Sequence, residues 1–389
     1  MVFVHKNGNS RRTAVLCAFG LSLVAGALFT GCSRKQAEFK IGFIAPLSGE
    51  YEHLRISYLQ GAELAVDEVT EGGGIEQGKT VIKPVLVVRD NEGATEKAVE
   101  YTHELINQEK VSAIIGLPFS RNAVPVGKIA DRYNIPMITP LSTHPATTKN
   151  RPCVYRVCFT DEFQGRLLAV FTFRDLGKGT AAILYDDSMN YSSHLAAVYS
   201  THYTDLGGKI VAAEAYADGE ADFRPYLERI RNAEPEVIFL PNFLSDLRMQ
   251  MQQLRELGIS ATVIGSDAMD AETQEEKKLL EGAYFCAHFS PDNPSKIVQR
   301  FVETYAEVYE QRPTYGAALN YDACRLLFTA LESAEGRDPE SVCRALAGID
   351  TFSGVTGTMV FGEGGDPQKS AVILRWVEME KRFYKEIQP

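Results

Sequence analysis

The sequence predicts an α/β protein built of two doubly wound parallel-sheet lobes. Short apolar runs rich in branched residues, such as Val111–Leu117 and Glu236–Leu240, indicate buried parallel strands. Amphipathic stretches of helical length alternate with these runs. The alternation occurs twice, over residues 41–145 and 181–268. Because strands that alternate with helices form parallel sheets covered on both faces, two such series predict two lobes with a cleft between them.

The first series has branched, apolar strands and helices with apolar residues at helical spacing. Its third strand ends at Pro118, and the following Ser120 is expected to be a helix N-cap. The expected strands are Lys40–Leu47, Val81–Arg89, Val111–Leu117 and Ile135–Thr139. The expected helices are Leu54–Thr70, Thr95–Gln108 and residues 120–133.

The second series repeats the pattern in similar lengths after a connecting helix, Phe163–Leu176. The expected strands are Ala181–Tyr185, Lys209–Tyr216, Glu236–Leu240 and Ala261–Gly265. The expected helices are Ser192–Leu206, Phe223–Arg231 and Ser245–Leu257. Beyond them the chain is less regular, with one more strand and four helices before a C-terminal β-hairpin whose turn is Gly362–Asp366. These elements are Ala271–Leu280, Gly282–His288, Pro294–Gln311, Tyr315–Ala334 and Pro339–Ala347.

The first 32 residues have the composition of an export signal. Basic residues precede an apolar stretch, Ala14–Phe29, that is short for a membrane span. The following Thr30-Gly31-Cys32 resembles the end of a bacterial lipobox, in which the cysteine is diacylated and becomes the first residue. We therefore expect a lipoprotein signal peptide over residues 1–31, lipidation of Cys32 and a lipid-anchored tether over residues 32–38. An ordinary secretory signal with a chance cysteine is the alternative.

Charge and cysteine content narrow the class of protein. The formal net charge is −11, and removal of residues 1–31 takes away three positive charges and leaves −14. Such an acidic chain argues against nucleic acid and anionic lipid headgroups as partners. The cysteines beyond residue 32 are too sparse for a disulfide framework and match no zinc pattern, and whether any of them pair stays open. They are Cys153, Cys158, Cys286, Cys324 and Cys343.

Hydroxyl, aromatic and acidic residues follow the predicted strands at the edge where open α/β sheets bind ligands. Ser120, and then Ser142 with Thr143, follow two strands of the first series, where a helix N-terminus suits a small anion such as a carboxylate. Phe243 and Asp267 follow the corresponding strands of the second series. Across a cleft they offer a carboxylate pole, a counter-charge for an ammonium and an aromatic wall, which a free α-amino acid needs.

Each of these residues also has a purely structural interpretation. Ser120 serves equally well as a helix cap, and Ser142 with Thr143 as a turn. Asp267 stands where it could cap the helix expected at residue 271. The ligand interpretation is favoured by the correspondence between the two series rather than by any single residue.

One motif match predicts no function. The stretch Gly73–Thr80, GGIEQGKT, satisfies the P-loop pattern, but the chemistry needs a strand before the loop and a helix after it. Here a helix is expected before it and a strand after it. The chain contains no pattern of a nucleophile with its base and no clustered histidines, so no catalytic residue, metal or cofactor is predicted.

Several fragments together resemble the periplasmic leucine/isoleucine/valine-binding protein family, the type I solute-binding proteins of ABC importers. They are IGFIAPLSG, GAELAVDEV, GGGI, IIGLPFS, IPMITPLSTHP, FQG and GVTG, in order between residues 40 and 379. The resemblance implies the hinged, two-lobed Venus-flytrap fold with discontinuous lobes. Residues 39–160 plus 292–352 would form lobe 1, and residues 161–291 plus 353–389 would form lobe 2.

The resemblance also implies roles for individual residues. Ser120 and Thr143 resemble the hydroxyls that hold the ligand carboxylate. The Ser142 backbone and the Thr143 hydroxyl would take the ammonium, with Asp267 as its counter-ion. Three further residues would line the aromatic and aliphatic walls of the cleft, namely Tyr191, Phe243 and Leu54. Asp267 replaces a glutamate of the family pattern, which bears on the identity of the ligand.

The function implied is that of an extracytoplasmic lipoprotein that captures a free amino acid, branched-chain or otherwise aliphatic, by closing its cleft. It would deliver the amino acid to an ABC permease of the inner membrane, as a monomer anchored by lipid on the periplasmic or extracellular side. Catalysis and a cofactor are not implied. Two alternatives remain: the same fold binding an amide, urea or an aromatic acid, and an interaction lipoprotein that regulates cell-envelope enzymes.

Overall fold

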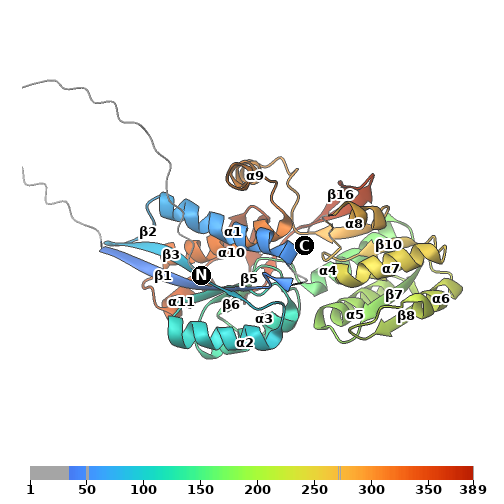
Figure 1. Ribbon diagram of the computed structural model, residues 1–389, viewed down its shortest axis with the longest axis horizontal. Coiled ribbons are helices and arrows are strands. Elements are labelled where there is room, and N and C mark those ends of the chain that lie inside the picture. The colour runs from blue at the N-terminus through green and yellow to red at the C-terminus, as the bar shows by residue number, and fades with distance from the viewer. Residues whose placement is uncertain (1–34, 50–51, 270, 272, 389) are drawn as a thin grey trace, which may run out of the picture. The chain divides into compact units, whose positions relative to one another are not determined.

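A six-stranded sheet organises the first lobe of the computed structural model, which describes residues 35–49, 52–269, 271 and 273–388 (Figure 1). Across the sheet the strands are β2 (Ile75–Gln77), β3 (Thr80–Asp90), β1 (Lys35–Ala45), β4 (Ala113–Gly116), β5 (Met137–Thr139) and β6 (Val154–Arg156). All neighbours are parallel except β2 and β3. Because β3 and β4 lie on opposite sides of β1, the strand order reverses between β1 and β4, where α/β sheets bind ligands.

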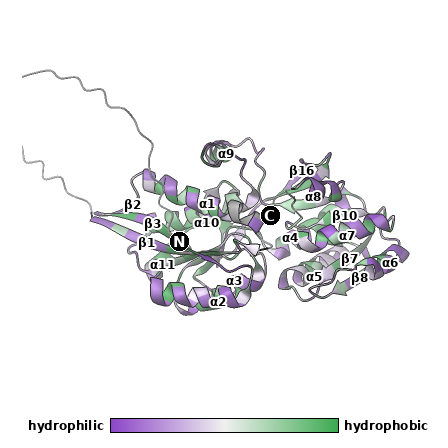
Figure 2. Ribbon diagram, in the orientation of Figure 1, coloured by the Kyte–Doolittle hydropathy of each residue, from purple (hydrophilic) through white to green (hydrophobic). Residues whose placement is uncertain are grey.

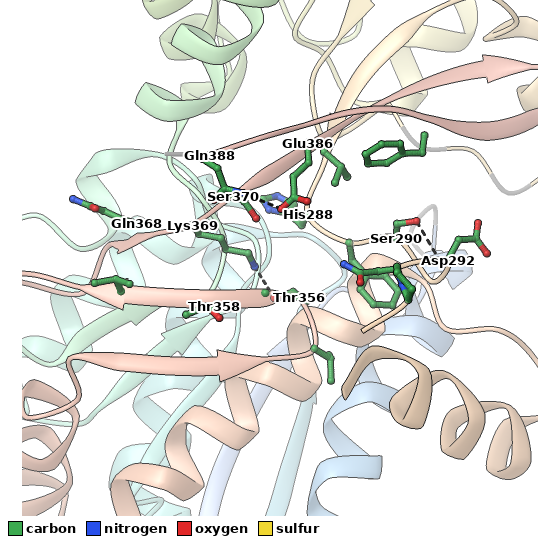
Figure 3. A pocket seen from close by; sticks show the side chains of 18 residues that line it. His288, Ser290, Asp292, Thr356, Thr358, Gln368, Lys369, Ser370, Glu386 and Gln388 are labelled. Carbon is green, nitrogen blue, oxygen red and sulfur yellow. Dashed lines mark hydrogen bonds between the residues drawn. The ribbon is translucent and has the colours of Figure 1, made fainter. Parts of the chain in front are cut away.

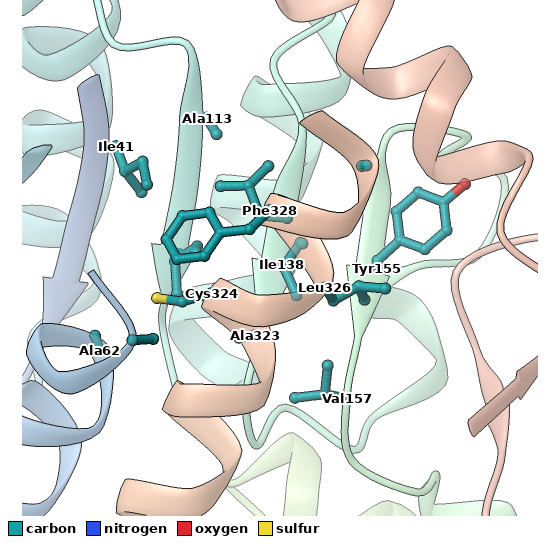
Figure 4. Close-up of a cluster of buried hydrophobic side chains, with 14 of the residues drawn as sticks. Ile41, Ala62, Ala113, Ile138, Tyr155, Val157, Ala323, Cys324, Leu326 and Phe328 are labelled. Carbon is teal, nitrogen blue, oxygen red and sulfur yellow. The ribbon is translucent and has the colours of Figure 1, made fainter. Parts of the chain in front are cut away.

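Helices cover both faces of this sheet and enclose separate apolar cores. On one face α1 (Glu52–Glu71) and α10 (Tyr315–Ser333) lie side by side, and Phe328 of α10 points in among sheet residues such as Ile138 (Figure 4). The two helices approach closely because Gly61 has no side chain, since a Cβ there would lie 2.0 Å from the Ala317 carbonyl oxygen. The remaining helices of this lobe are α2 (Thr95–Glu104), α3 (Ser120–Arg132), α9 (Lys296–Tyr309) and α11 (Pro339–Ala347).

A seven-stranded sheet organises the second lobe. Its order is β16 (Glu380–Ile387), β15 (Ala371–Val377), β11 (Tyr284–Ala287), β10 (Thr262–Gly265), β9 (Val237–Leu240), β7 (Thr180–Asp186) and β8 (Lys209–Tyr216). The strands from β11 to β8 are parallel, and β15 and β16 add an antiparallel edge. Here the order reverses between β7 and β9, so each lobe has one such switch point.

The helices of the second lobe have apolar inner faces and polar outer faces. Its helices are α4 (Asp161–Val170), α5 (Asn190–Asp205), α6 (Arg224–Asn232), α7 (Leu244–Glu256) and α8 (Gln274–Leu279). In α6 only Leu227 and Ile230 are buried, and Figure 2 shows this helix largely in the hydrophilic colour. The inner faces and the strands form two cores, one on each side of the sheet.

A small third sheet follows α11 and packs with the first lobe. It comprises β12 (Thr351–Gly354), β13 (Gly357–Phe361) and β14 (Pro367–Gln368). Phe352, Met359 and Phe361 lie in the same core as the first sheet. The first-lobe packing therefore extends past residue 352, where we expected the boundary, because alternate residues of this hairpin face the first core.

The structure confirms the α/β class with two doubly wound parallel-sheet lobes and corrects several details. β1 begins at Lys35 and pairs with β3 from Thr80 onward, so residues 35–38 are strand rather than tether. The short strands β2 and β6 were not predicted. The P-loop-like stretch does run from a helix, α1, to β3, with β2 inside it, as the sequence indicated.

Two of the cysteines are paired. A disulfide joins Cys153, just before β6, to Cys343 in α11, with a Cα–Cα distance of 5.2 Å. Cys158, Cys286 and Cys324 are free and buried. Over the described ranges no helix combines the length and apolarity needed to cross a membrane. Cys32 and the predicted signal peptide lie outside the described residues.

Candidate ligand-binding site

Strained backbone shapes the first-lobe edge of the site. After β4 the buried Leu117 adopts a left-handed φ of 59°, a conformation that an aliphatic residue rarely takes outside functional regions. The chain then turns, and α3 begins at Ser120 itself, with Phe119 at the N-cap position and no capping side chain. Our expectation that Ser120 caps this helix is therefore wrong, and its hydroxyl is available for other contacts.

The predicted hydroxyl residues do lie together. The Ser120 Oγ accepts hydrogen bonds from the Ser142 Oγ at 3.1 Å and from the His144 N–H at 3.4 Å. The Ser142 Oγ also lies 2.7 Å from the Thr147 Oγ1. Ser120, Ser142 and Thr143 are all buried. Among them the Thr143 hydroxyl makes no hydrogen bond of standard geometry, although it is near enough to the Asp161 carboxylate to act on its pKa.

Asp161 is a site residue that the sequence analysis missed. It is the first residue of α4, after the N-cap Thr160, and its backbone N–H donates to the Thr143 carbonyl at 3.0 Å. Its carboxylate is fully buried, and neither oxygen has a hydrogen-bond partner of standard geometry. The sequence Thr160-Asp161-Glu162 is a helix-start signal that would have placed this carboxylate at the edge of the site.

Burial and a second carboxylate disturb the ionisation of Asp161. Burial, reinforced by the negative charge of Asp267, raises the pKa of Asp161 to about 8, although the nearby Thr143 hydroxyl and Arg156 act in the opposite direction. Asp161 is therefore mostly protonated at neutral pH in the ligand-free protein. A cation brought to this position would favour its ionised form.

Asp267 follows β10 and has its own partners. Its Oδ1 accepts from the Tyr191 hydroxyl at 2.6 Å, and its Oδ2 lies 2.9 Å from the His288 Nε2. Burial disfavours its charge, but the hydrogen bond and charge of His288 and the Tyr191 hydroxyl hold the pKa of Asp267 below its ordinary value. Asp267 does not cap α8, because Thr273 and Glu276 form a capping box there.

Aromatic rings from both lobes meet at the site. The ring of Tyr191, at the start of α5, stacks on that of Phe243 with centroids 5.1 Å apart. Phe243, at the N-cap of α7, in turn meets the edge of Phe119 from the first lobe at 5.4 Å. The strand ends of the two lobes are thus brought together as the sequence indicated. Leu54 lies in α1, and its side chain is outside the described part of the structure.

Two cavities adjoin the chain segments that pass between the lobes. One, of 570 Å³, has Asp267 and His288 in its wall, together with Ser57 of α1 and Tyr315 of α10. The other, of 890 Å³, shares His288 with the first and is shown in Figure 3. In this second cavity the buried Lys369 Nζ donates to the Thr356 hydroxyl at 2.5 Å and to the Val157 carbonyl at 2.8 Å, so its hydrogen-bonding capacity is partly met there.

The site has two chemically different sides. We call Ser120, Ser142 and Thr143 the hydroxyl pole, and Asp161 with Asp267 the acidic pole. Hydroxyls on the first-lobe edge and two carboxylates on the second-lobe side line the site, and the negative charge of Asp267 contributes to the raised pKa of Asp161. In the ligand-free protein Asp161 therefore holds a proton while Asp267 is ionised, because burial and the charge of Asp267 disfavour a second ionised carboxylate. No group of three or more potential metal-ligating side chains is found among the described residues. The arrangement can therefore bind a small molecule with an anionic and a cationic end.

Comparison with known proteins agrees with this architecture. The family model described as periplasmic binding protein matches residues 38–381. The Leu/Ile/Val-binding protein BraC3 of Rhizobium johnstonii is 25% identical over 359 residues, which cover 91% of this chain and 95% of that protein.

Solved structures give the same result. The leucine-binding protein LivK of Thermotoga maritima has a TM-score of 0.84 at 29% identity and covers 90% of this chain and 99% of its own. LivJ of Streptococcus pneumoniae, in complex with isoleucine, has a TM-score of 0.83 at 26% identity. The match covers 91% of this chain and 100% of LivJ. A benzoate complex of a Rhodopseudomonas palustris solute-binding protein, at 21% identity and a TM-score of 0.79, shows the shared fold. The chain belongs to the periplasmic binding protein family.

Proposed function

We propose that this protein is the solute-binding component of an ABC importer and that it captures a free α-amino acid. The ligand carboxylate would lie against Ser120 and Thr143, and its ammonium would lie between Asp161 and Asp267. The rings of Tyr191 and Phe243 would flank the ligand side chain. In this arrangement the ammonium satisfies Asp161, and the carboxylate or the ammonium satisfies the Thr143 hydroxyl.

The observation that carries the proposal is the buried Asp161 carboxylate, which makes no hydrogen bond of standard geometry and whose pKa is raised by burial and by the negative charge of Asp267. An ionised, buried carboxylate without a partner is strongly unfavourable, which keeps Asp161 protonated in the ligand-free protein. A ligand ammonium would remove that penalty and donate up to three hydrogen bonds. The names of the relatives, leucine/isoleucine/valine-binding proteins, support an aliphatic side chain.

A second candidate is an aromatic carboxylic acid. It is favoured by the three contacting rings of Phe119, Tyr191 and Phe243, which suit a flat ligand. Such an acid would use the hydroxyl pole but would bring no cation to Asp161. It therefore leaves the acidic pole unsatisfied, and the amino acid is the better fit.

A thermal-shift screen of the twenty amino acids, benzoate, simple amides and urea tests the proposal. A ligand that binds only the native state raises its stability by RT ln(1 + [L]/Kd), so an amino acid at a hundredfold excess over Kd adds about 2.7 kcal/mol. We expect the largest shift with an aliphatic amino acid. A shift with benzoate and none with any amino acid would favour the second candidate.

Export and anchoring are separate parts of the proposal. We propose that Cys32 is the lipidated mature N-terminus and that the protein delivers its ligand to a permease in the membrane. Two acyl chains hold a protein firmly, at about 0.8 kcal/mol per buried methylene. Cys32→Ala should move the protein to the soluble fraction or leave uncleaved precursor. An unchanged mass and membrane fraction would contradict lipidation and leave the ligand proposal intact.

A further inference from the structure

Arg156, at the end of β6, is a fully buried guanidinium beside the hydroxyl pole. Its Nη1 donates to the Ser142 carbonyl, and its Nη2 donates to the His144 carbonyl at 3.0 Å. Nη2 also donates to the Thr148 Oγ1 at 2.8 Å. One side chain thus holds the backbone on both sides of Thr143.

These contacts determine how the loop faces the ligand. The carbonyls of Ser142 and His144 point to Arg156, whereas the carbonyl between them, that of Thr143, accepts from the Asp161 N–H at 3.0 Å. Three successive carbonyls are therefore fixed, so the backbone of Thr143 has little freedom. The Thr143 hydroxyl, which makes no hydrogen bond of standard geometry inside the protein, is thereby held in a defined place near Asp161.

Arg156 is itself held by Asp366, 210 residues later in the chain. Its Nε donates to the Asp366 Oδ1 at 2.6 Å, and the same oxygen accepts from the Thr148 hydroxyl at 2.6 Å. Asp366 forms an ion pair with Arg156, and its side chain is 45% exposed. It lies in the turn between β13 and β14.

The turn that carries Asp366 lies directly against β6. The Arg156 backbone N–H donates to the Gly365 carbonyl at 2.9 Å. A Cβ on Gly365 would lie 1.9 Å from the Val154 carbonyl oxygen, so only glycine lets the turn approach so closely. The distance between Asp366 and Arg156 is therefore set by backbone contact rather than by flexible side chains.

We propose that Arg156 and Asp366 form a positioning pair that holds Ser142–His144 in the ligand-binding conformation. The inference rests on the proposed function, because it assigns the pair a role in binding at the same site. Neither residue needs to touch the ligand. Arginine suits the task because its planar donors are rigidly spaced and it stays charged at all relevant pH values. Without the accepting oxygen of Asp366 the guanidinium loses the partner of its Nε and shifts toward other acceptors, which moves the two carbonyls.

Asp366→Ala tests the pair, because the residue is partly exposed in a turn and its removal leaves both cores intact. We expect amino-acid affinity, measured by calorimetry well below the unfolding temperature, to fall about tenfold. Glu363→Ala is the matched control, since Glu363 is an exposed carboxylate of the same turn with no contact to Arg156. It removes the same charge and should change affinity less than twofold.

A conservative variant distinguishes positioning from stability alone. Asp366→Asn keeps an oxygen that accepts from Arg156 and Thr148, so it should retain affinity within about threefold of wild type. Thr148→Val removes the hydroxyl that contacts both Arg156 and Asp366, so it should also weaken amino-acid binding. This variant gives an independent test if Asp366→Ala does not fold. A merely structural role predicts a lower unfolding temperature in Asp366→Ala with unchanged affinity.

The outcomes separate the two proposals. If wild type binds an amino acid and the folded Asp366→Ala and Thr148→Val variants bind it equally well, the positioning pair is wrong and the proposed function stands. If wild type binds none of the twenty amino acids, the proposed function is wrong. Loss of affinity in Glu363→Ala equal to that in Asp366→Ala would reduce the effect to net charge and also overturn the pair.

Discussion

The two edges of the candidate site satisfy their polar groups in different ways. On the first-lobe edge the hydroxyls of Ser120, Ser142 and Thr147 bond to one another and are neutral. On the second-lobe side the groups are carboxylates, and one of them, Asp161, has no partner. The first edge is complete except for Thr143, whereas the second is complete only when a cation arrives.

The chemistry of the two groups explains the difference. A hydroxyl both donates and accepts, so a few hydroxyls can satisfy one another. A carboxylate only accepts when ionised, so it depends on donors from elsewhere. Asp267 receives donors from Tyr191 and His288, but Asp161 does not. We therefore expect the acidic pole to discriminate among ligands more sharply than the hydroxyl pole.

The largest effect should come from Asp161→Asn. Asn resembles the protonated Asp161 of the ligand-free protein, so the fold should be retained. Removing one partner of a buried charge pair costs about 3–5 kcal/mol, so amino-acid affinity should fall at least a hundredfold. Calorimetry with the best amino acid measures it, with Glu162→Gln as the neighbouring charge control. Equal losses in both variants would remove the special role of Asp161.

Asp267→Asn should have the next largest effect. We expect amino-acid affinity to fall tenfold to a hundredfold, because a hydrogen bond to a charged group contributes about 1.5–3 kcal/mol. The Asn oxygen still accepts from Tyr191, so the unfolding temperature without ligand should change little. If affinity is unchanged, Asp267 contacts only Tyr191 and His288, and Asp161 alone binds the ligand ammonium.

Binding should depend on pH because Asp161 must ionise. Its pKa is about 8 without ligand, and an ammonium stabilises the ionised form, so binding releases a proton below that pH. Amino-acid affinity should rise about tenfold per pH unit up to pH 8 and then level off. Calorimetry in buffers of different ionisation enthalpy detects the released proton. Wild-type affinity that is constant between pH 6 and 8 would contradict the shifted pKa.

The same shift has a consequence for the ligand-free protein. The ordinary pKa of an aspartate is 3.8, whereas that of folded Asp161 is about 8. Between these values the folded state holds one proton more than the unfolded state, so stability falls as pH rises across the window. The unfolding temperature of the ligand-free protein should therefore fall as pH rises from about 4 to 8. Asp161→Asn should lose the part of this pH dependence that comes from Asp161.

The smallest effect should come from the hydroxyl pole. Ser120→Ala removes one neutral hydrogen bond, which contributes about 0.5–1.5 kcal/mol, so amino-acid affinity should fall about threefold to tenfold. Ser333→Ala, at the end of α10, is the control for losing a serine hydroxyl elsewhere. A loss of affinity as large as that of Asp161→Asn would show that the two poles contribute equally to ligand binding.

The alternation of strands and helices was readable from the sequence because it depends on local hydrophobic periodicity. Ser120, Ser142, Thr143, Phe243 and Asp267 could be proposed from the sequence because parallel strands deliver their carboxyl ends to one edge of a sheet. The π-helical turns that end α2 and α4 were merged into the predicted helices, since side-chain spacing barely changes over one turn. The three-residue strands β2 and β6 are too short to show periodicity.

Contacts between distant segments were decided only by the tertiary structure. The Cys153–Cys343 disulfide, the Asp267–His288 pair and the Arg156–Asp366 pair join residues that no local pattern relates. The same holds for the isolation of Asp161, whose carboxylate looked in sequence like an ordinary charge in a first helical turn. The ionisation of a buried group depends on how many donors and charges surround it in space, and spacing along the chain does not carry that information.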